Sequence, residues 1–172
     1  MKNIVLVGMM GVGKSAVGRM LAKELEMEFI DTDAQIEALV GMPIRDICKK
    51  HGIIRFHSEE ELVISKLKDS SNLVIATGEG TIMNDKNYTI LTHNSIIIFL
   101  NAAAETIYTR ICRKNNRSLL PKGATLDTVR ELIANNYYLY SSRSHYEVVV
   151  DKQDLDAVVA EIITYYKAHL SS

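Results

Sequence analysis

The sequence has almost no net charge, few cysteines and no hydrophobic run long enough to cross a membrane. Its 172 residues carry a formal net charge of −1, which argues against a nucleic-acid-binding protein that relies on neutralising phosphates. Cys48 and Cys112 lack Cys-x-x-Cys spacing, so we expect neither a disulfide nor a cysteine metal site. The apolar run at residues 4–7 is too short for a membrane span and leads into glycines rather than a cleavage site. We therefore expect a cytoplasmic protein with a small-molecule partner and with no nucleic-acid or membrane partner.

Long polar linkers and low-complexity segments are also missing, which indicates a single domain over residues 1–172. With 47% hydrophobic residues the chain can bury a real core. Short apolar runs alternate with amphipathic stretches, an order that predicts a doubly wound α/β sheet of parallel strands. The expected strands are residues 4–7, 29–30, 73–76, 96–100 and 148–150, and the expected helices are residues 14–26, 56–68, 104–113, 126–140 and 155–169. Pro43 and Gly52 mark the start and the end of one further short helix.

A glycine-rich loop between the first strand and the first helix carries the strongest functional signal. The segment GMMGVGKS at residues 8–15 has the spaced glycines and the final Gly-Lys-Ser of a phosphate-binding loop. Such a loop directs backbone N–H groups and a helix N-terminus at phosphates. The pattern predicts a bound nucleoside triphosphate, with Lys14 at the β- and γ-phosphates and Ser15 at Mg²⁺. The expected nucleotide contacts are Gly11, Val12, Gly13, Lys14, Ser15 and Ala16.

Two carboxylates follow the second predicted strand. Asp31 and Asp33 flank Thr32, at the carboxyl end of the sheet, where doubly wound folds bind ligands. One carboxylate can accept hydrogen bonds from Mg²⁺-bound water, and the other can accept the proton of an attacking hydroxyl. The structural alternative is a helix N-cap, because Asp and Thr often begin helices.

Two later segments also have both a functional and a structural interpretation. The turn Gly78-Glu79-Gly80 can bring backbone N–H groups to a substrate, or its glycines can serve steric needs alone. The basic segment at residues 110–117, followed by Pro-Lys-Gly, is either a lid that closes over phosphates or a solvated surface loop.

Taken together, GMMGVGKSAVGR, DTD, TGEG and NRSLL resemble the shikimate kinase family in order, spacing and chain length, over nearly the whole chain. The resemblance implies a nucleoside-monophosphate-kinase-like fold with a five-stranded parallel sheet and helices on both faces. It also implies a lid over about residues 112–124 and a small substrate-binding helical insertion over about residues 32–70. The implied activity transfers the γ-phosphoryl group of ATP, with Mg²⁺, to the 3-hydroxyl of shikimate or a similar hydroxylated acid, in a monomer.

The same resemblance assigns roles by position. Arg110 is expected along the adenine, against which the segment containing Gln153 packs, and Arg117 is expected to move onto the transferring phosphate. Such roles are positioning and charge neutralisation, which supply most of phosphoryl-transfer catalysis. The implied catalytic residues are Lys14, Asp33 and Arg117, and the implied metal-binding residues are Ser15 and Asp31.

The chain departs from the family pattern where the acceptor is expected to bind. His57 stands in place of an Arg that grips the shikimate carboxylate, and Glu79 stands in place of the middle glycine of a triple glycine. A second carboxylate-binding Arg aligns with Asn136 or, with a one-residue gap, with Arg143. Pairing of His57 with Glu79 is one compensation. The implied substrate-binding residues are Asp33, His57, Gly78, Glu79, Gly80, Asn136 and Arg143.

Shikimate kinase is therefore the favoured function. Two alternatives stay open at this point. One is a kinase of a different small hydroxylated metabolite, and the other is a nucleotide-binding, kinase-like protein without shikimate turnover.

Overall fold

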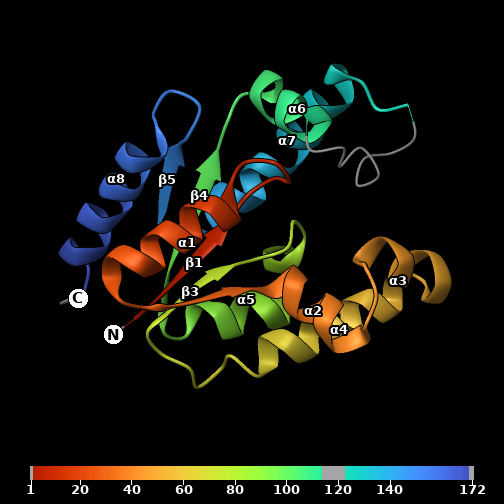
Figure 1. Cartoon of the computed structure of the whole chain (residues 1–172), viewed down its shortest axis with the longest axis horizontal. Helices are drawn as coiled ribbons and strands as arrows, with labels where there is room; N and C mark the ends of the chain where they lie inside the picture. Colours follow the sequence, from red (N-terminus) through yellow and green to blue (C-terminus); the bar gives the residue numbers. More distant parts are fainter. Residues whose placement is uncertain (1, 114–122, 171–172) are drawn as a thin grey trace.

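A parallel sheet is the centre of the computed structural model, which describes residues 2–113 and 123–170 (Figure 1). In this part of the chain five parallel strands pair in the order β2-β3-β1-β4-β5. The strands are β1 (Asn3–Val7), β2 (Glu28–Asp31), β3 (Leu73–Ala76), β4 (Ser95–Asn101) and β5 (Tyr146–Val149). Each overlaps one of the predicted apolar runs, so the predicted sheet is confirmed.

The helices also follow the predicted order, with three elements outside the predicted helical ranges. They are α1 (Lys14–Leu25), α2 (Thr32–Val40), α3 (Ile44–His51), α4 (Ile53–Ser65), the 3-10 turn η1 (Thr81–Met83), α5 (Asp85–Thr92), α6 (Ala104–Arg113), α7 (Leu126–Ser142) and α8 (Leu155–Ala168). Helix α2 corresponds to the N-cap alternative for Asp31, and α5 was not expected. Both begin at a side-chain cap: Asp31 accepts a hydrogen bond from the Ala34 N–H, and Asn84 accepts from the N–H groups of Lys86 and Asn87.

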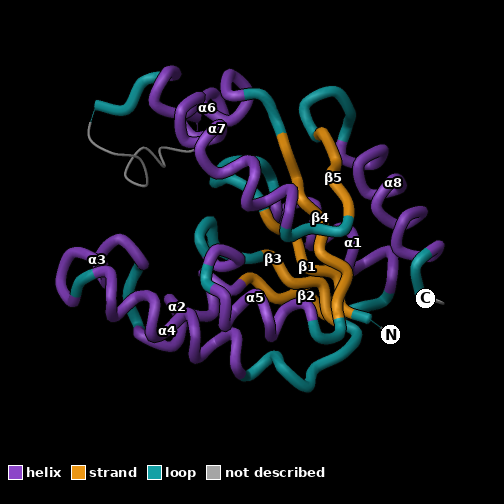
Figure 2. Tube along the Cα trace, turned by 180° about the vertical axis from the view of Figure 1, so that it is seen from behind, coloured by secondary structure: helices purple, strands orange, loops and turns teal. Residues whose placement is uncertain are grey.

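Helices cover both faces of the sheet. Helices α1 and α8 lie on one face and α5 and α7 on the other, as the two opposite views show (Figures 1 and 2). On the first face Gly18 of α1 packs directly against the side chains of Phe29 and Leu6. On the second face Tyr140 of α7 stacks on Phe99, with ring centroids 5.1 Å apart. The central strand β1 is buried along its whole length, as expected for a strand covered on both sides.

The helices α2, α3 and α4 form a separate small unit beside the sheet (Figure 1). Ile36, Ile47 and Val63 are its buried centre, and this cluster is distinct from the main core. The substrate-binding insertion expected over about residues 32–70 falls on this unit. The expected lid, over about residues 112–124, lies mostly outside the described residues.

The turn from β1 into the glycine loop depends on Gly8. Its φ is +139°, and a Cβ added there would lie 2.4 Å from the Leu100 carbonyl oxygen on the neighbouring strand. Since this neighbour is backbone of a buried strand, it cannot move aside without breaking the sheet. Only glycine fits between β1 and β4 at this point.

We predict that Gly8→Ala destabilises the fold by about 3 kcal/mol or more, because it adds a clash with backbone to a strained φ. Gly41→Ala is the matched control, since Gly41 also has positive φ, +76°, but nothing lies within 4 Å of an added Cβ. The control substitution should cost only about 1 kcal/mol. Urea unfolding midpoints compare the two, and equal losses would contradict the proposed role of the Leu100 carbonyl.

Candidate active site

Three chain segments leave the sheet side by side at the carboxyl ends of β1, β2 and β3. Asp31 is in register with Ala76, and Ala76 is in register with Leu6. The glycine loop, the start of α2 and the turn after β3 therefore emerge at the same level. This edge of a doubly wound sheet is where ligands bind.

Lys14, the first residue of α1, lies folded against the glycine loop. Its ammonium group donates hydrogen bonds to the carbonyl oxygens of Gly8, at 2.6 Å, and Met9, at 3.0 Å. Burial lowers the pKa of the Lys14 amine, whereas nearby carboxylates, Asp33 foremost, act in the opposite direction. A half-buried cation is thus held between the loop and the acidic residues of the neighbouring segments.

Ser15 and Asp31 meet next to Lys14. The Ser15 hydroxyl donates to Asp31 Oδ2 at 2.7 Å, while Asp31 Oδ1 accepts the Ala34 N–H at 3.3 Å. The N-cap interpretation of Asp31 is therefore confirmed, and the same carboxylate faces the residue expected at the metal. One hydroxyl and one carboxylate fit Mg²⁺, which prefers hard oxygen ligands, retains several waters and takes further oxygens from phosphates.

A cavity of about 320 Å³ adjoins the glycine loop. Arg110 of α6 and Gln153 both line it, together with Gly11 and Gly13 of the loop. The Arg110 guanidinium donates to the Val12 carbonyl oxygen at 2.7 Å, so it is fixed against the loop. The residues expected around an adenine thus share one cavity adjoining the phosphate-binding loop.

Asp33, in the first turn of α2, has a buried oxygen that is unsatisfied. Asp33 Oδ1 has no hydrogen-bond partner among the described residues. Burial raises the pKa of this carboxyl to about 6, and Lys14 partly opposes the rise. Such orphaned buried oxygens are rare in proteins and usually indicate a ligand or a catalytic role.

Gly78 allows the turn after β3 to approach Asp33. A Cβ on Gly78 would lie 2.6 Å from Asp33 Oδ1, so any side chain there would cover the free oxygen. The Gly78 N–H donates to the Thr32 hydroxyl at 3.1 Å, which fixes the turn to α2. Thr32 was not among the expected site residues, although its place between Asp31 and Asp33 was a usable signal.

Glu60 of α4 also lies next to the turn at Gly78. It is 1% exposed, and its Oε1 accepts a hydrogen bond from the Thr81 hydroxyl at 2.6 Å. His57, one turn earlier on α4, has its Nδ1 3.5 Å from Glu60 Oε2. The pairing of His57 with Glu79 that the sequence allowed is therefore not formed, because His57 faces Glu60 within its own helix.

Glu79 and Gly80 complete the turn. The Glu79 backbone carbonyl accepts a hydrogen bond from the hydroxyl of Tyr140, a fully buried residue of α7. Burial raises the pKa of the Glu79 carboxyl, and the charge of Lys14 opposes this rise. A Cβ added at Gly80 would meet no atom of the described residues within 4 Å. Steric contact with these residues therefore does not require a glycine at this position.

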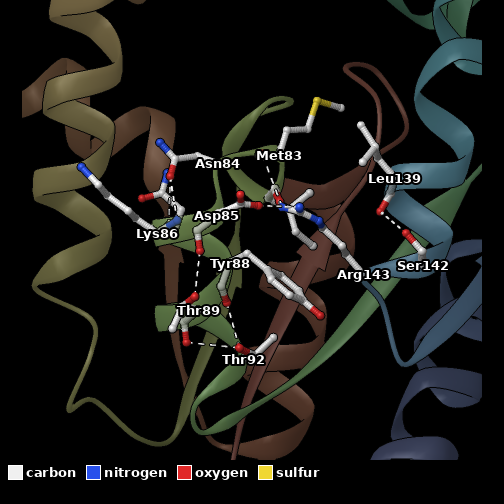
Figure 3. Close-up of polar contacts among 12 residues, drawn as sticks. Met83, Asn84, Asp85, Lys86, Tyr88, Thr89, Thr92, Leu139, Ser142 and Arg143 are labelled. Atoms are coloured by element: carbon white, nitrogen blue, oxygen red, sulfur yellow. Dashed lines mark hydrogen bonds and ion pairs between the residues drawn. The ribbon is translucent and has the colours of Figure 1, made fainter.

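The two candidates for the second acceptor anchor differ in their surroundings. Asn136 of α7 lies with its Nδ2 4.0 Å from Met9 Sδ in the glycine loop. Arg143 instead donates to the carbonyl oxygens of Ile82 and Met83 and to Asp85 Oδ1, at 2.8, 3.3 and 2.5 Å, as Figure 3 shows for Met83 and Asp85. Its guanidinium also lies over the Tyr88 ring, 4.9 Å from the centroid. The Arg143 guanidinium is thus bound to η1 and α5, whereas the Asn136 amide lies next to the glycine loop. Arg117 lies outside the described residues.

Comparison with known proteins identifies the relatives of this chain. The family model described as shikimate kinase matches residues 10–167. The chain belongs to the shikimate kinase family. A curated shikimate kinase from Pelotomaculum thermopropionicum is 43% identical over 98% of each chain, and one from Desulforudis audaxviator is 40% identical over 97% of this chain and 87% of the other.

Solved structures of the family share the fold. Shikimate kinase from Acinetobacter baumannii in complex with shikimate has a TM-score of 0.92 and 32% identity, covering 100% of this chain and 96% of that one. Shikimate kinase from Aquifex aeolicus has a TM-score of 0.82 and 28% identity, covering 97% and 98%. The predicted phosphate-loop fold is therefore confirmed.

Membership of the shikimate kinase family gives the class of reaction. The chain is a phosphotransferase that uses ATP and Mg²⁺ and acts on a hydroxyl group. Over residues 2–113 and 123–170 no helix has both the length and the apolar character needed to cross a membrane.

We predict that Asp33→Asn stabilises this shikimate kinase family member while removing its activity. The folded-state pKa of about 6 lies above the ordinary value of 3.8, so ionised Asp33 costs stability, in full above about pH 6 and not at all below about pH 4. Asparagine should therefore raise the unfolding midpoint by about 2–5 °C at pH 8 and leave it unchanged at pH 4. Asp69→Asn, at an exposed position, is the control and should change neither the unfolding midpoint nor the activity. An Asp33→Asn protein that is no more stable than wild type at pH 8 would contradict the assignment.

Proposed function

We propose that this chain is a shikimate kinase, which transfers the γ-phosphoryl group of ATP to the 3-hydroxyl of shikimate. The observation that carries the proposal is the buried Oδ1 of Asp33, which lies close to the charge of Lys14 and has no hydrogen-bond partner in the described part of the chain. A carboxylate oxygen with no partner, beside a phosphate-binding Lys, suits an acceptor hydroxyl that must lose its proton. The match to an Acinetobacter baumannii enzyme in complex with shikimate supports the same acceptor.

On the donor side the roles follow from the loop. The backbone N–H groups of residues 11–16 bind the phosphates at the N-terminus of α1, and Lys14 exchanges its bonds to the loop carbonyls for bonds to phosphate oxygens. Ser15 and Asp31 hold Mg²⁺, which neutralises phosphate charge when bound. Arg110 and Gln153 border the adenine, and Arg117 adds positive charge at the transferring group.

On the acceptor side Asp33 orients the hydroxyl and accepts its proton as the new O–P bond forms and the bond to the leaving phosphate breaks. A base with a pKa near 6 is ionised at neutral pH yet binds a proton readily. Gly78 keeps this oxygen open. His57, Glu79, Gly80 and Asn136 surround the rest of the acceptor, which the α2–α4 unit encloses.

The setting of the reaction is also proposed. The chain acts in the cytoplasm without a nucleic-acid partner, because its charge is nearly balanced and its two cysteines lack Cys-x-x-Cys spacing. As the family resemblance implies, it acts as a monomer. Turnover of a different hydroxylated metabolite is a second candidate, since Glu79 brings a carboxylate to the acceptor side.

A coupled ADP-release assay tests the proposal with shikimate and a panel of small polyols and hydroxy acids. Shikimate should give saturable turnover, and Lys14→Ala should reduce it by about 10³-fold or more, because phosphoryl transfer depends on charge neutralisation. Lys23→Ala, at an exposed position near the end of α1, is the control and should retain full activity. Turnover of another acceptor in place of shikimate would refute the proposed substrate.

Asn136 and Arg143 can be separated by their kinetics. Asn136→Ala should raise the KM for shikimate roughly 3- to 10-fold, the loss expected for one hydrogen bond. Arg143→Ala should leave KM unchanged but lower stability by about 1–3 kcal/mol, since it removes bonds that join α7 to η1 and α5. A raised KM for Arg143→Ala, with an unchanged KM for Asn136→Ala, would instead assign Arg143 to the acceptor site.

A further inference from the structure

We propose that Glu161 of α8 is a positioning residue for the nucleotide base, which holds the Gln153 side-chain amide in the orientation that selects adenine over guanine. This role rests on the proposed function only in placing the base in the cavity beside Arg110 and Gln153. It does not depend on the identity of the acceptor.

The cavity next to the glycine loop has mostly apolar walls. Val17 of α1 and Val158 of α8 both line it, which suits the faces of a flat base. Among the described residues, the polar side chains that line it are those of Arg110 and Gln153. Arg110 carries donors only, and one of them is bound to the Val12 carbonyl oxygen. The Gln153 amide can present either a donor or an acceptor, so it is the group that can distinguish one base from another.

The amide nitrogen of Gln153 is engaged by two acceptors. Nε2 donates to Glu161 Oε2 at 2.8 Å and to the Val149 carbonyl oxygen at 3.4 Å. A carboxylate and a carbonyl accept hydrogen bonds but do not donate them, so both require the NH₂ end of the amide. Over residues 2–113 and 123–170, Gln153 Oε1 has no hydrogen-bond partner. This oxygen is therefore left for a ligand in the cavity that Gln153 lines.

Glu161 can hold the amide because its own carboxylate is fixed. While Oε2 binds Gln153, Oε1 accepts a hydrogen bond from the Tyr146 hydroxyl of β5 at 2.9 Å. The Tyr146 ring is stacked on Tyr165 of α8, with centroids 4.2 Å apart, and the Tyr165 hydroxyl donates to the His145 carbonyl oxygen at 3.0 Å. Strand β5 and helix α8, which lie side by side (Figures 1 and 2), thus hold both oxygens of Glu161 in place.

The fixed amide favours one purine over the other. Adenine carries an amino group, a donor, at the position where guanine carries a carbonyl oxygen, an acceptor. Gln153 Oε1 can accept a hydrogen bond from adenine, but with guanine it would place acceptor against acceptor. An amide free to turn over would remove this difference, since Nε2 could then donate to guanine. Glu161 therefore gives selectivity by excluding the orientation that guanine needs.

Calorimetric titration of the full chain with Mg·ADP and with Mg·GDP tests this role without any acceptor. Wild-type protein should bind ADP about tenfold more tightly than GDP, the effect expected from one hydrogen bond gained or opposed. Glu161→Ala frees the amide, so GDP should bind more tightly and ADP more weakly than to wild type, which lowers the preference to about twofold. Glu131→Ala, at an exposed position on α7, removes the same side chain and should keep the wild-type preference.

Glu161→Lys is a second and sharper variant. An ammonium group donates hydrogen bonds but does not accept them, so it should bind Gln153 Oε1 and turn Nε2 toward the cavity. GDP should then bind at least as tightly as ADP. The same titrations measure this reversal.

A double-mutant cycle separates positioning from a purely structural role. If Glu161 acts through Gln153, Gln153→Ala should lower the preference as far as Glu161→Ala does, and the double variant should lower it no further. The inference is overturned by an unchanged preference in both Glu161 variants, by equal weakening of ADP and GDP in Glu161→Ala, or by additive changes in the double variant. If shikimate is not phosphorylated while the preference depends on Glu161, the inference stands and the proposed acceptor fails.

Discussion

The placement of one half-buried cation, Lys14, organises the site. Its ammonium is desolvated, so it requires oxygen partners, and it finds them in the carbonyls of the loop and in the field of Asp31, Asp33 and Glu79. The same carboxylates would repel one another without it. Donor and acceptor halves of the site are thus coupled through a single charge, which must be shared with the phosphates once nucleotide binds.

The sheet makes this arrangement possible. Strands β2, β3 and β1 are adjacent, so residues separated by about seventy positions in sequence lie side by side at its carboxyl edge. Two glycines at that edge leave room that a side chain would fill. Gly8 lets the chain after β1 pass close to the Leu100 carbonyl, and Gly78 leaves the Asp33 oxygen uncovered. Gly8 directly follows the buried strand β1, and Gly78 lies two residues after the buried strand β3.

Much of the fold and part of the candidate site could be predicted from the sequence, for identifiable reasons. The strands, the glycine loop and the approach of Asp31 to Ser15 follow from local patterns and from parallel-sheet topology. Helix α5 was missed because its signal is a single cap, Asn84, on a short element. The partner of His57 and the choice between Asn136 and Arg143 depend on which side chains meet across helices, such as Arg143 over Tyr88. Periodicity carries no information about such contacts.

The small core of α2, α3 and α4 has a consequence for dynamics. Its own buried hydrophobic cluster consists of Ile36, Ile47 and Val63 among the described residues, whereas the main core spans the whole sheet. A unit held by so few apolar contacts opens locally at a lower free energy than the sheet. Amide hydrogens of α3 should therefore exchange with solvent well before those of β1, through partial unfolding that leaves the nucleotide half intact. An acceptor that contacts both the α2–α4 unit and the sheet would slow this exchange, so occupancy at the acceptor side can be followed by backbone protection alone.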